Sequence, residues 1–469
     1  MKPKRVLVIA YHFPPIGGSG TQRPAKFVKH LPHFGWQPYV ITTDRPYGDE
    51  SQGYDTTLLA DIPPATPVWR APTPQPQPVY HLARRLGWRS VALGNAPIAP
   101  APAPKGAAPR GTAPVPPDAP LVRLRHALLA PLYWVHHPPV DPAFYWALRI
   151  VPLARQIIER ERIDAIFTTV PPWSALLTGA LLRRLTGRPW VADFRDPWTD
   201  NTFIYFPSAR RRAVDQRLER ACLDRADAVI SVTGPWVEGL RSKAGQPDKP
   251  FVLIPNGWDR DDFPDQPAPG KAPSPLGGEE GVIVLRHPGS TYQGEPLPLL
   301  RALEQLPPAV TQRLRIHLIG HLHPQDRAEI EHSPHADCFL LSPQRVSHPE
   351  ALRLMRDAHV LLLLRKGPDA SSGKIFEYMM AGRPVLAISA KAGVAAQLVR
   401  ACGIGCAVDA EDASELAQVL AWLATDYRAF VDKCYRPAWA EIERMERKRL
   451  TGELAQLLDE VVATPRRGK

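Results

Sequence analysis

The stretch Asp369-Ala-Ser-Ser-Gly-Lys-Ile-Phe-Glu-Tyr-Met-Met-Ala-Gly-Arg-Pro384 stands between two short apolar runs, Val360–Leu364 and Val385–Ile388. Each run has the length of one buried strand in a parallel sheet. The serines and glycine before Lys374 are typical of a helix start, and Gly382 with the nearby proline is typical of a helix end. The stretch therefore predicts a strand, a loop, a short helix and a second strand, which is the repeating unit of an α/β fold.

Two carboxylates bracket this unit, Asp369 in the loop and Glu377 inside the predicted helix. They are eight residues apart and cannot share one helical face unless the helix begins earlier than Ser371, so we expect both to turn toward a crevice at the carboxyl end of the first strand. The helix start at Ser372, Gly373 and Lys374 adds free backbone N–H groups and a positive dipole end, which suit a phosphate. The segment is therefore a candidate binding site for a phosphorylated ligand.

The whole phrase resembles the retaining glycosyltransferases of the GT-B fold, specifically glycosyltransferase family 4. The resemblance rests on an acidic residue, a seven-residue spacer, and Glu377 followed by Tyr-Met-x-Ala-Gly-x-Pro-Val. It implies that Glu377 holds the ribose hydroxyls of a nucleotide-sugar donor and that Asp369 lies near the transferred sugar. Asp369 stands where relatives have a longer Glu. A lone carboxylate on a helix is, by contrast, typical of a solvated face.

A glycine-rich loop follows the first predicted strand, which ends at Ala10. The loop contains Gly17 and Gly18 and leads into a helix predicted over 21–31. Strand, glycine loop and helix bring backbone N–H groups close to a phosphate, although a tight turn is the simpler interpretation. The phrase resembles the opening motif of the family, in which this loop faces the donor diphosphate and sugar. Arg23, early in the helix, is placed within reach of either substrate.

The phrase Trp190-Val-Ala-Asp-Phe-Arg-Asp-Pro-Trp198 places charged residues at the end of a further strand. Asp193, Arg195 and Asp196 should therefore lie at the edge of the sheet where ligands bind. The phrase resembles family members that build bacterial surface polysaccharides, and it makes Asp196 a catalytic candidate. An ion pair that holds the loop is the alternative interpretation.

The second half of the chain departs from the family in one loop. After a strand predicted over 282–285, the segment 288–295 lacks the Lys or Arg that meets the donor diphosphate in relatives. Since the phosphate charge must be met, we expect Arg286, His287 or Lys374 to take that role. Val346 matches a position whose backbone lies near the nucleotide base in relatives.

The predicted fold class is α/β with GT-B architecture. It comprises two doubly wound, Rossmann-like domains that face each other across a cleft, with a C-terminal helix crossing back to the first. Two proline-rich insertions, 61–78 and 96–120, are not expected to form packed elements. The predicted divisions are an acceptor-binding domain at 1–259, a linker at 260–281, a nucleotide-sugar-binding domain at 282–435 and a crossing helix with a basic tail at 436–469.

Composition narrows the partners and the location. The 469 residues carry a net charge of +11 but no nucleic-acid-binding signature, which favours phosphorylated substrates or an anionic membrane surface. The segment 121–135 is too short to span a bilayer, and it either lies at the membrane interface or packs on its own domain. Five unpaired cysteines and the absence of an apolar leader predict a cytoplasmic protein, peripheral to the membrane in one interpretation.

The resemblance and the charge together predict a sugar transferase that needs no metal or other cofactor. The donor is a nucleoside-diphosphate sugar and the acceptor a glycan or lipid-linked precursor of surface polysaccharide or lipopolysaccharide. The proposed catalytic residues are Asp369, Lys374 and Asp196, and transfer with retention implies front-face attack. Three alternatives stay open: a non-catalytic GT-B-like binding or assembly subunit, a membrane-surface adaptor, and a sugar-nucleotide epimerase, although the spaced carboxylates favour transfer.

Overall fold

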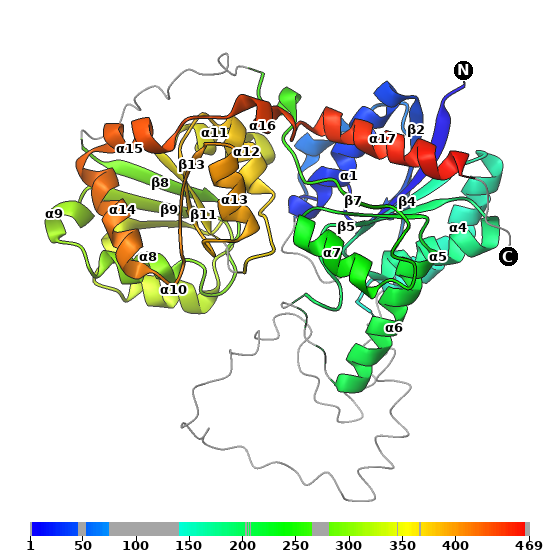
Figure 1. Cartoon of the computed structure of the whole chain (residues 1–469), viewed down its shortest axis with the longest axis horizontal. Helices are drawn as coiled ribbons and strands as arrows, with labels where there is room; N and C mark the ends of the chain where they lie inside the picture. The colour runs from blue at the N-terminus through cyan, green and yellow to red at the C-terminus, as the bar shows by residue number, and fades with distance from the viewer. Residues whose placement is uncertain are drawn as a thin grey trace, which may run out of the picture.

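The computed structural model describes residues 2–45, 53–74, 140–201, 204, 206, 208–264, 281–344, 346–364 and 367–464. These residues form two lobes, each built around one parallel sheet with helices packed on its faces (Figure 1). The α/β class and the two-domain architecture predicted from the sequence are confirmed.

The first lobe contains a seven-stranded sheet in the order β3-β2-β1-β4-β5-β6-β7. Its strands are β1 Lys4–Ala10, β2 Trp36–Thr43, β3 Val68–Ala71, β4 Ala165–Val170, β5 Trp190–Phe194, β6 Ala228–Ser231 and β7 Phe251–Leu253. Its helices are α1 Ser19–His30, α4 Phe144–Arg160, α5 Ser174–Thr186, α6 Ala209–Arg225 and α7 Gly234–Lys243, with short 3-10 helices η1 Leu31–Phe34, η2 Thr56–Asp61 and η3 Arg260–Asp262.

The second lobe contains a six-stranded sheet in the order β10-β9-β8-β11-β12-β13. Its strands are β8 Ile283–Pro288, β9 Leu314–Ile319, β10 Phe339–Ser342, β11 Val360–Leu364, β12 Val385–Ile388 and β13 Gly405–Val408. Its helices are α8 Leu297–Leu303, α9 Pro308–Thr311, α10 Pro324–Glu331, α11 His348–Arg356, α12 Lys374–Met380, α13 Val394–Ala401, α14 Ala413–Thr425, α15 Tyr427–Cys434 and α16 Trp439–Glu443, with η4 Ala336–Cys338. The last helix, α17 Arg447–Ala463, packs on the first lobe.

The central strands are apolar because both faces of each sheet are covered. Every residue of β11 and β12 is buried, and the two strands pair in parallel from Leu361↔Val385 to Leu364↔Ile388. A strand covered on both sides needs a continuous apolar run instead of an alternating one. The sequence pattern on either side of the 369–384 stretch therefore predicted this part of the sheet correctly.

Strand order positions the loops that carry the candidate residues. The chain order reverses between β1 and β4 in the first sheet and between β8 and β11 in the second. Open α/β sheets bind ligands at the carboxyl ends of strands at such reversals. The loop with Gly17 and Gly18 follows β1, and the segment 289–296 follows β8, so each lobe presents one loop from its reversal point.

The chain crosses between the lobes twice, and the two crossings contact each other. Trp258, after β7, is buried and donates from its indole Nε1 to the Ile442 carbonyl at 2.8 Å. Its backbone carbonyl accepts from the Arg447 N–H at 2.7 Å. Helix α17 then runs along α1 on the first lobe, as Figure 1 shows in red and blue. The predicted return of the C-terminal segment to the first domain is confirmed.

Two expectations about local structure were wrong. Part of the proline-rich segment 61–78 forms β3, which pairs in parallel with β2 from Val40↔Val68 to Thr43↔Ala71. An edge strand bonds on one side only, so it tolerates flanking prolines. The charged C-terminal segment is not one long helix, because the chain breaks between α16 and α17 to bond with Trp258.

The insertion at 96–120 and the amphipathic segment at 121–135 lie outside the described residues. Within the part of the chain that the structure does describe, no helix combines the length and hydrophobicity required to cross a bilayer.

Candidate active site

Lys374 reaches from the start of α12 to the loop after β8. Its Nζ lies 3.1 Å from His287 Nε2 and 3.2 Å from the Ser290 carbonyl oxygen. The side chain passes so close to Gly289 that a Cβ there would lie 2.1 Å from Lys374 Cε, and Gly289 also has a φ of +131°. Only glycine combines this backbone conformation with this clearance. The Lys374 ammonium is therefore held against the loop after β8, the loop that lacks the Lys or Arg found in relatives.

His287 orients this lysine. Its ring is buried, and Nδ1 lies 2.9 Å from the Leu362 carbonyl oxygen in the neighbouring strand. Because a carbonyl only accepts hydrogen bonds, Nδ1 carries the proton and Nε2 presents a lone pair to the Lys374 ammonium. His287 was one of the three groups expected to replace the basic residue missing from the loop. It instead accepts a hydrogen bond from the Lys374 ammonium and so fixes the position of that ammonium.

Two acidic side chains accept hydrogen bonds from the backbone of the loop after β8. Asp326 is buried and accepts from the Gly294 N–H at 2.7 Å, and Glu295 accepts from the Tyr292 N–H at 2.8 Å. These bonds fix the backbone of the segment between β8 and α8. Glu295, which stands near the position of the missing base, is therefore part of the scaffold of the loop.

The other predicted residues of the second lobe are spread around this corner. Ser372 Oγ accepts from the Lys374 N–H at 3.4 Å, and Gly373 is the residue before α12. Asp369 is exposed in the preceding loop, and Val346 is 37% exposed just before α11. Arg286 points elsewhere: its Nη1 donates to the Leu354 carbonyl of α11 at 3.1 Å. Among the three groups expected to meet phosphate, Lys374 and His287 lie together, whereas Arg286 is turned toward α11.

Glu377 lies in the first turn of α12 and is paired with a histidine. Its Oε1 is 2.9 Å from His348 Nε2, and the two side chains are 20% and 14% exposed. His348 opens α11, and its backbone N–H donates to Asp55 Oδ2 of the first lobe at 3.0 Å. The sequence did not single out His348 or Asp55. The available signal was the Ser-His-Pro helix start directly after Val346, which places a side chain at the same edge of the sheet.

The glycine loop of the first lobe is tied to the segment that carries Asp55. The Gly17 N–H donates to the Gly53 carbonyl at 3.0 Å, and the Asp55 N–H donates to the Pro15 carbonyl at 2.7 Å. Gly18 is exposed and has a φ of +96°, a conformation that favours glycine. The predicted donor-facing loop and the residue that contacts α11 therefore form one unit.

The charged motif after β5 holds loops together. Arg195 donates to three backbone carbonyls, those of Val170, Pro171 and Gly20. Asp193 is fully buried and pairs with Arg23 at 2.8 Å, which corrects the expectation that Arg23 reaches a substrate. Asp196 is half-buried beside Arg195. Burial lowers the pKa of the Arg195 guanidinium, and the charge of Asp196 offsets part of that decrease.

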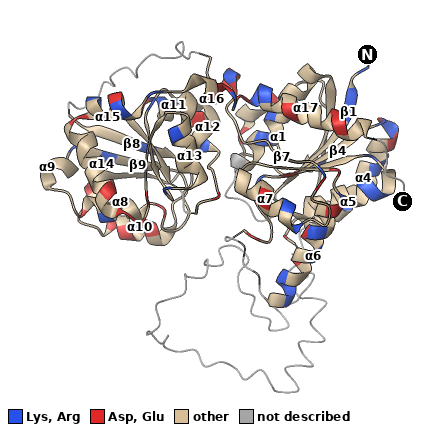
Figure 2. Ribbon diagram, in the orientation of Figure 1, with Lys and Arg blue, Asp and Glu red and all other residues tan. Residues whose placement is uncertain are grey.

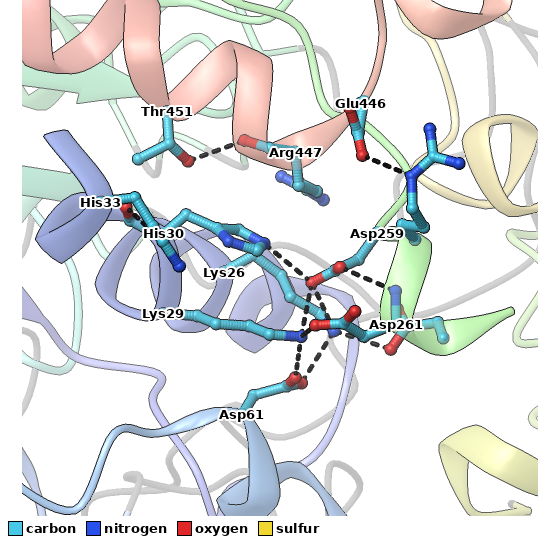
Figure 3. Close-up of polar contacts among 12 residues, drawn as sticks. Lys26, Lys29, His30, His33, Asp61, Asp259, Asp261, Glu446, Arg447 and Thr451 are labelled. Atoms are coloured by element: carbon cyan, nitrogen blue, oxygen red, sulfur yellow. Dashed lines mark hydrogen bonds and ion pairs between the residues drawn. The ribbon is translucent and has the colours of Figure 1, made fainter. Parts of the chain in front are cut away.

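A second buried charge cluster joins the first lobe to the crossing segment (Figure 3). Lys26 Nζ lies 2.9 Å from Asp61, 3.0 Å from Asp259 and 2.7 Å from Asp262. Burial raises the pKa of Asp259, but the hydrogen bond from His30 and the lysine charges hold that pKa well below its usual range. Among the described residues this is the one acidic group with metal-like spacing, and the Lys26 ammonium lies among its oxygens. We therefore assign it to structural support.

The fold and the placement of these loops define a two-domain GT-B protein. A family model described as "Glycosyl transferase 4-like domain" matches residues 18–257, and one described as "Glycosyl transferases group 1" matches residues 296–426. The chain belongs to this group 1, family-4-type glycosyltransferase family, as the sequence motifs predicted.

Solved structures share the fold over nearly the whole chain. Sucrose-phosphate synthase from Thermosynechococcus elongatus matches with a TM-score of 0.61 and 16% identity, covering 98% of this chain and 99% of its own. HepE from Anabaena, in complex with UDP and glucose, matches with a TM-score of 0.60 and 16% identity over 97% and 100%. A glycosyltransferase from Rickettsia africae matches with 0.59 and 14% over 99% and 100%. A search of curated protein sequences finds no significant match.

Proposed function

We propose that the protein transfers a sugar, with retention at the anomeric carbon, from a nucleoside-diphosphate sugar to a lipid-linked or surface-glycan acceptor. The observation that carries the donor site is the convergence of Lys374, His287 and the 289–296 loop at the carboxyl edge of β8 and β11, with Glu377 one turn further along α12. HepE, of the same fold, has been solved with UDP-glucose.

In this proposal Glu377 Oε2 accepts hydrogen bonds from the ribose, since Oε1 is already bonded to His348. Lys374 and the N–H groups of the 289–296 loop bind the diphosphate, because an ammonium and backbone donors together satisfy phosphate oxygens. Gly17 and Gly18 of the first lobe face the transferred sugar. The proposed diphosphate site consists of Lys374 and backbone N–H groups and includes no metal.

The chemistry follows from these positions. The acceptor hydroxyl attacks the anomeric carbon on the face of the leaving group, and the bond between that carbon and the diphosphate oxygen breaks. The acceptor proton passes to the departing phosphate oxygen, while Lys374 stabilises the developing negative charge. Asp369 is assigned to the sugar hydroxyls and Asp196 to the acceptor side, and neither serves as a covalent nucleophile.

A lipid-linked acceptor is supported by the charge of α6. Its exposed arginines are Arg210, Arg212, Arg217, Arg220 and Arg225, whereas Asp215 and Glu219 of the same helix are buried. Asp224, 34% exposed, lies 4.0 Å from Arg220. Figure 2 shows basic residues toward the outer end of this helix. A helix whose solvent-facing charges are predominantly positive attracts anionic lipid headgroups. The acceptor would then be reached at the inner face of the membrane.

The donor site is tested by calorimetry with UDP, GDP, ADP and dTDP. One nucleotide should bind the wild type, and Glu377→Gln should weaken that binding about 10- to 100-fold, because the ribose hydroxyls then meet a neutral amide instead of a carboxylate. Lys374→Met should weaken binding of the nucleoside diphosphate and leave binding of the free nucleoside unchanged. Glu350→Gln, at a partly exposed glutamate of α11 that pairs with Arg353, is the matched control and should bind like the wild type.

Equal nucleotide affinity in the wild type and Glu377→Gln would contradict this donor site. Anomeric coupling constants in the NMR spectrum of the product distinguish retention from inversion. A folded protein that binds a nucleotide but never turns over a sugar would instead favour the non-catalytic binding or assembly subunit.

A further inference from the structure

His348 connects the two lobes through its backbone. It is the first residue of α11, where N–H groups lack partners within the helix. Its N–H donates to Asp55 Oδ2 at 3.0 Å, while Asp55 Oδ1 accepts from the Thr57 N–H at 3.0 Å at the start of η2. One carboxylate of the first lobe therefore bonds to the starts of two helices, one in each lobe.

The side chain of His348 connects the same point to Glu377. His348 Nε2 and Glu377 Oε1 are 2.9 Å apart. Since a carboxylate only accepts, the proton lies on Nε2. This bond restrains the glutamate, leaving Oε2 as the oxygen available to a ligand. Because both side chains are mostly buried, water competes weakly for the bond.

The charges around the ring determine its protonation. Glu377 faces it from α12, Asp262 from η3 and Lys26 from α1, and Asp55 faces the backbone of the same residue. Burial lowers the pKa of His348, but the hydrogen bond and charge of Glu377 and the charge of Asp262 raise it above its ordinary value of 6.5. The stabilisation from the charged ring is therefore complete below pH 6.5 and is lost as pH rises through the folded-state pKa.

The connection continues into the first lobe. Asp55 donates its N–H to the Pro15 carbonyl, and the carbonyl of Gly53, two residues earlier, accepts from the Gly17 N–H. A chain of hydrogen bonds thus links the glycine loop to Asp55, Asp55 to His348, and His348 to Glu377. The orientation of the donor carboxylate is therefore coupled to the contact between the lobes.

We propose that His348 is a positioning residue of the donor site: it holds Glu377 in the orientation that binds ribose, and Asp55 couples that orientation to closure of the lobes. This inference rests on the proposed donor site. In the charged state the bond joins an imidazolium to a carboxylate, and it weakens when the ring loses its proton, because a neutral donor then bonds to the carboxylate. Donor affinity should therefore decrease as pH rises through the titration of His348.

The test measures nucleoside-diphosphate affinity by calorimetry from pH 6 to pH 9 in the wild type, His348→Gln and His348→Ala. The affinity of the wild type for the nucleoside diphosphate should decrease as pH rises. His348→Gln donates one neutral bond at every pH, so its affinity should stay flat near the high-pH value of the wild type. His348→Ala should bind about tenfold more weakly than the wild type at pH 6. His332→Gln, at an exposed histidine of the second lobe, is the control and should keep the wild-type profile.

The first-lobe arm uses Asp55→Ala. It should weaken donor binding in the wild-type background and add less than about twofold in His348→Ala, because without the imidazole the Asp55 bond to the backbone of residue 348 no longer affects Glu377. Thermal unfolding of each variant checks that the protein is folded, and His348→Gln retains a donor if the alanine variant fails to fold.

The outcomes separate this inference from the donor site itself. If Glu377→Gln loses affinity while both His348 variants match the wild type across the pH range, the positioning role is refuted and the donor site stands. If no nucleotide binds the wild type, the proposed function fails, and the positioning role fails with it.

Discussion

Replacing Arg23 with methionine should destabilise the first lobe strongly. Arg23 and Asp193 are 1% and 0% exposed, and the guanidinium contacts the carboxylate through Nη2 at 2.8 Å and Nε at 3.0 Å. Thr169 Oγ1 donates a further bond to Asp193 at 2.7 Å. Methionine fills a similar volume but leaves a buried carboxylate without its cation. Removing one partner of such a pair costs about 3–5 kcal/mol.

This loss of folding free energy corresponds to a measurable decrease in melting temperature. For a domain of about 150–250 residues, 1 kcal/mol shifts Tm by about 2–4 °C, so Arg23→Met should lower the Tm of the first-lobe transition by about 6–20 °C. Differential scanning calorimetry and urea unfolding of the whole protein measure the change. The transition of the second lobe, which contains neither residue, is an internal reference.

Two comparisons make this prediction specific. Asp193→Asn added to Arg23→Met should recover part of the loss, because the unpaired charge is removed. Arg155→Met disrupts an exposed pair with Glu159, 54% and 61% exposed, and should cost less than about 1 kcal/mol. If Arg23→Met melts like the wild type and loses only substrate affinity, the pair is not a structural requirement and Arg23 contacts the ligand after all.

The other predictions concern a buried cation and a basic surface. Arg447 is 6% exposed, its Nη1 has no hydrogen-bond partner in the described part of the chain, and burial lowers its pKa to about 10. Arg447→Met should therefore raise Tm by several degrees, by removal of a desolvated charge; a lower Tm would contradict this reasoning. Replacing Arg210, Arg212 and Arg217 together with glutamine should reduce co-sedimentation with phosphatidylglycerol vesicles by about 100-fold, at about 1 kcal/mol per charge. The matched control replaces three exposed arginines of the second lobe with glutamine. An equal loss of vesicle binding in the two triple variants would show that only net charge matters. The two sets are Arg210, Arg212 and Arg217 on α6, and Arg400, Arg428 and Arg436 on the second lobe.

The sequence alone predicted the features that depend on neighbouring residues. Apolar runs marked β11 and β12, and the loop and helix between them followed from serine, glycine and proline chemistry. The family followed from the same stretch, because the spacing between its two carboxylates and the residues after Glu377 form a local pattern. Lys374 was placed correctly at a helix start for the same reason.

Only the tertiary structure decided which side chains meet. Arg23 and Asp193 are 170 positions apart, and no local pattern indicates that they form a buried pair. The same holds for His348 and Asp55, which come from different lobes and are 293 positions apart. Strand β3 forms in a proline-rich segment because β2 offers it an open edge. Periodicity reports how a segment folds on itself, whereas a buried charge is stabilised by whichever distant residue packing brings within hydrogen-bond distance.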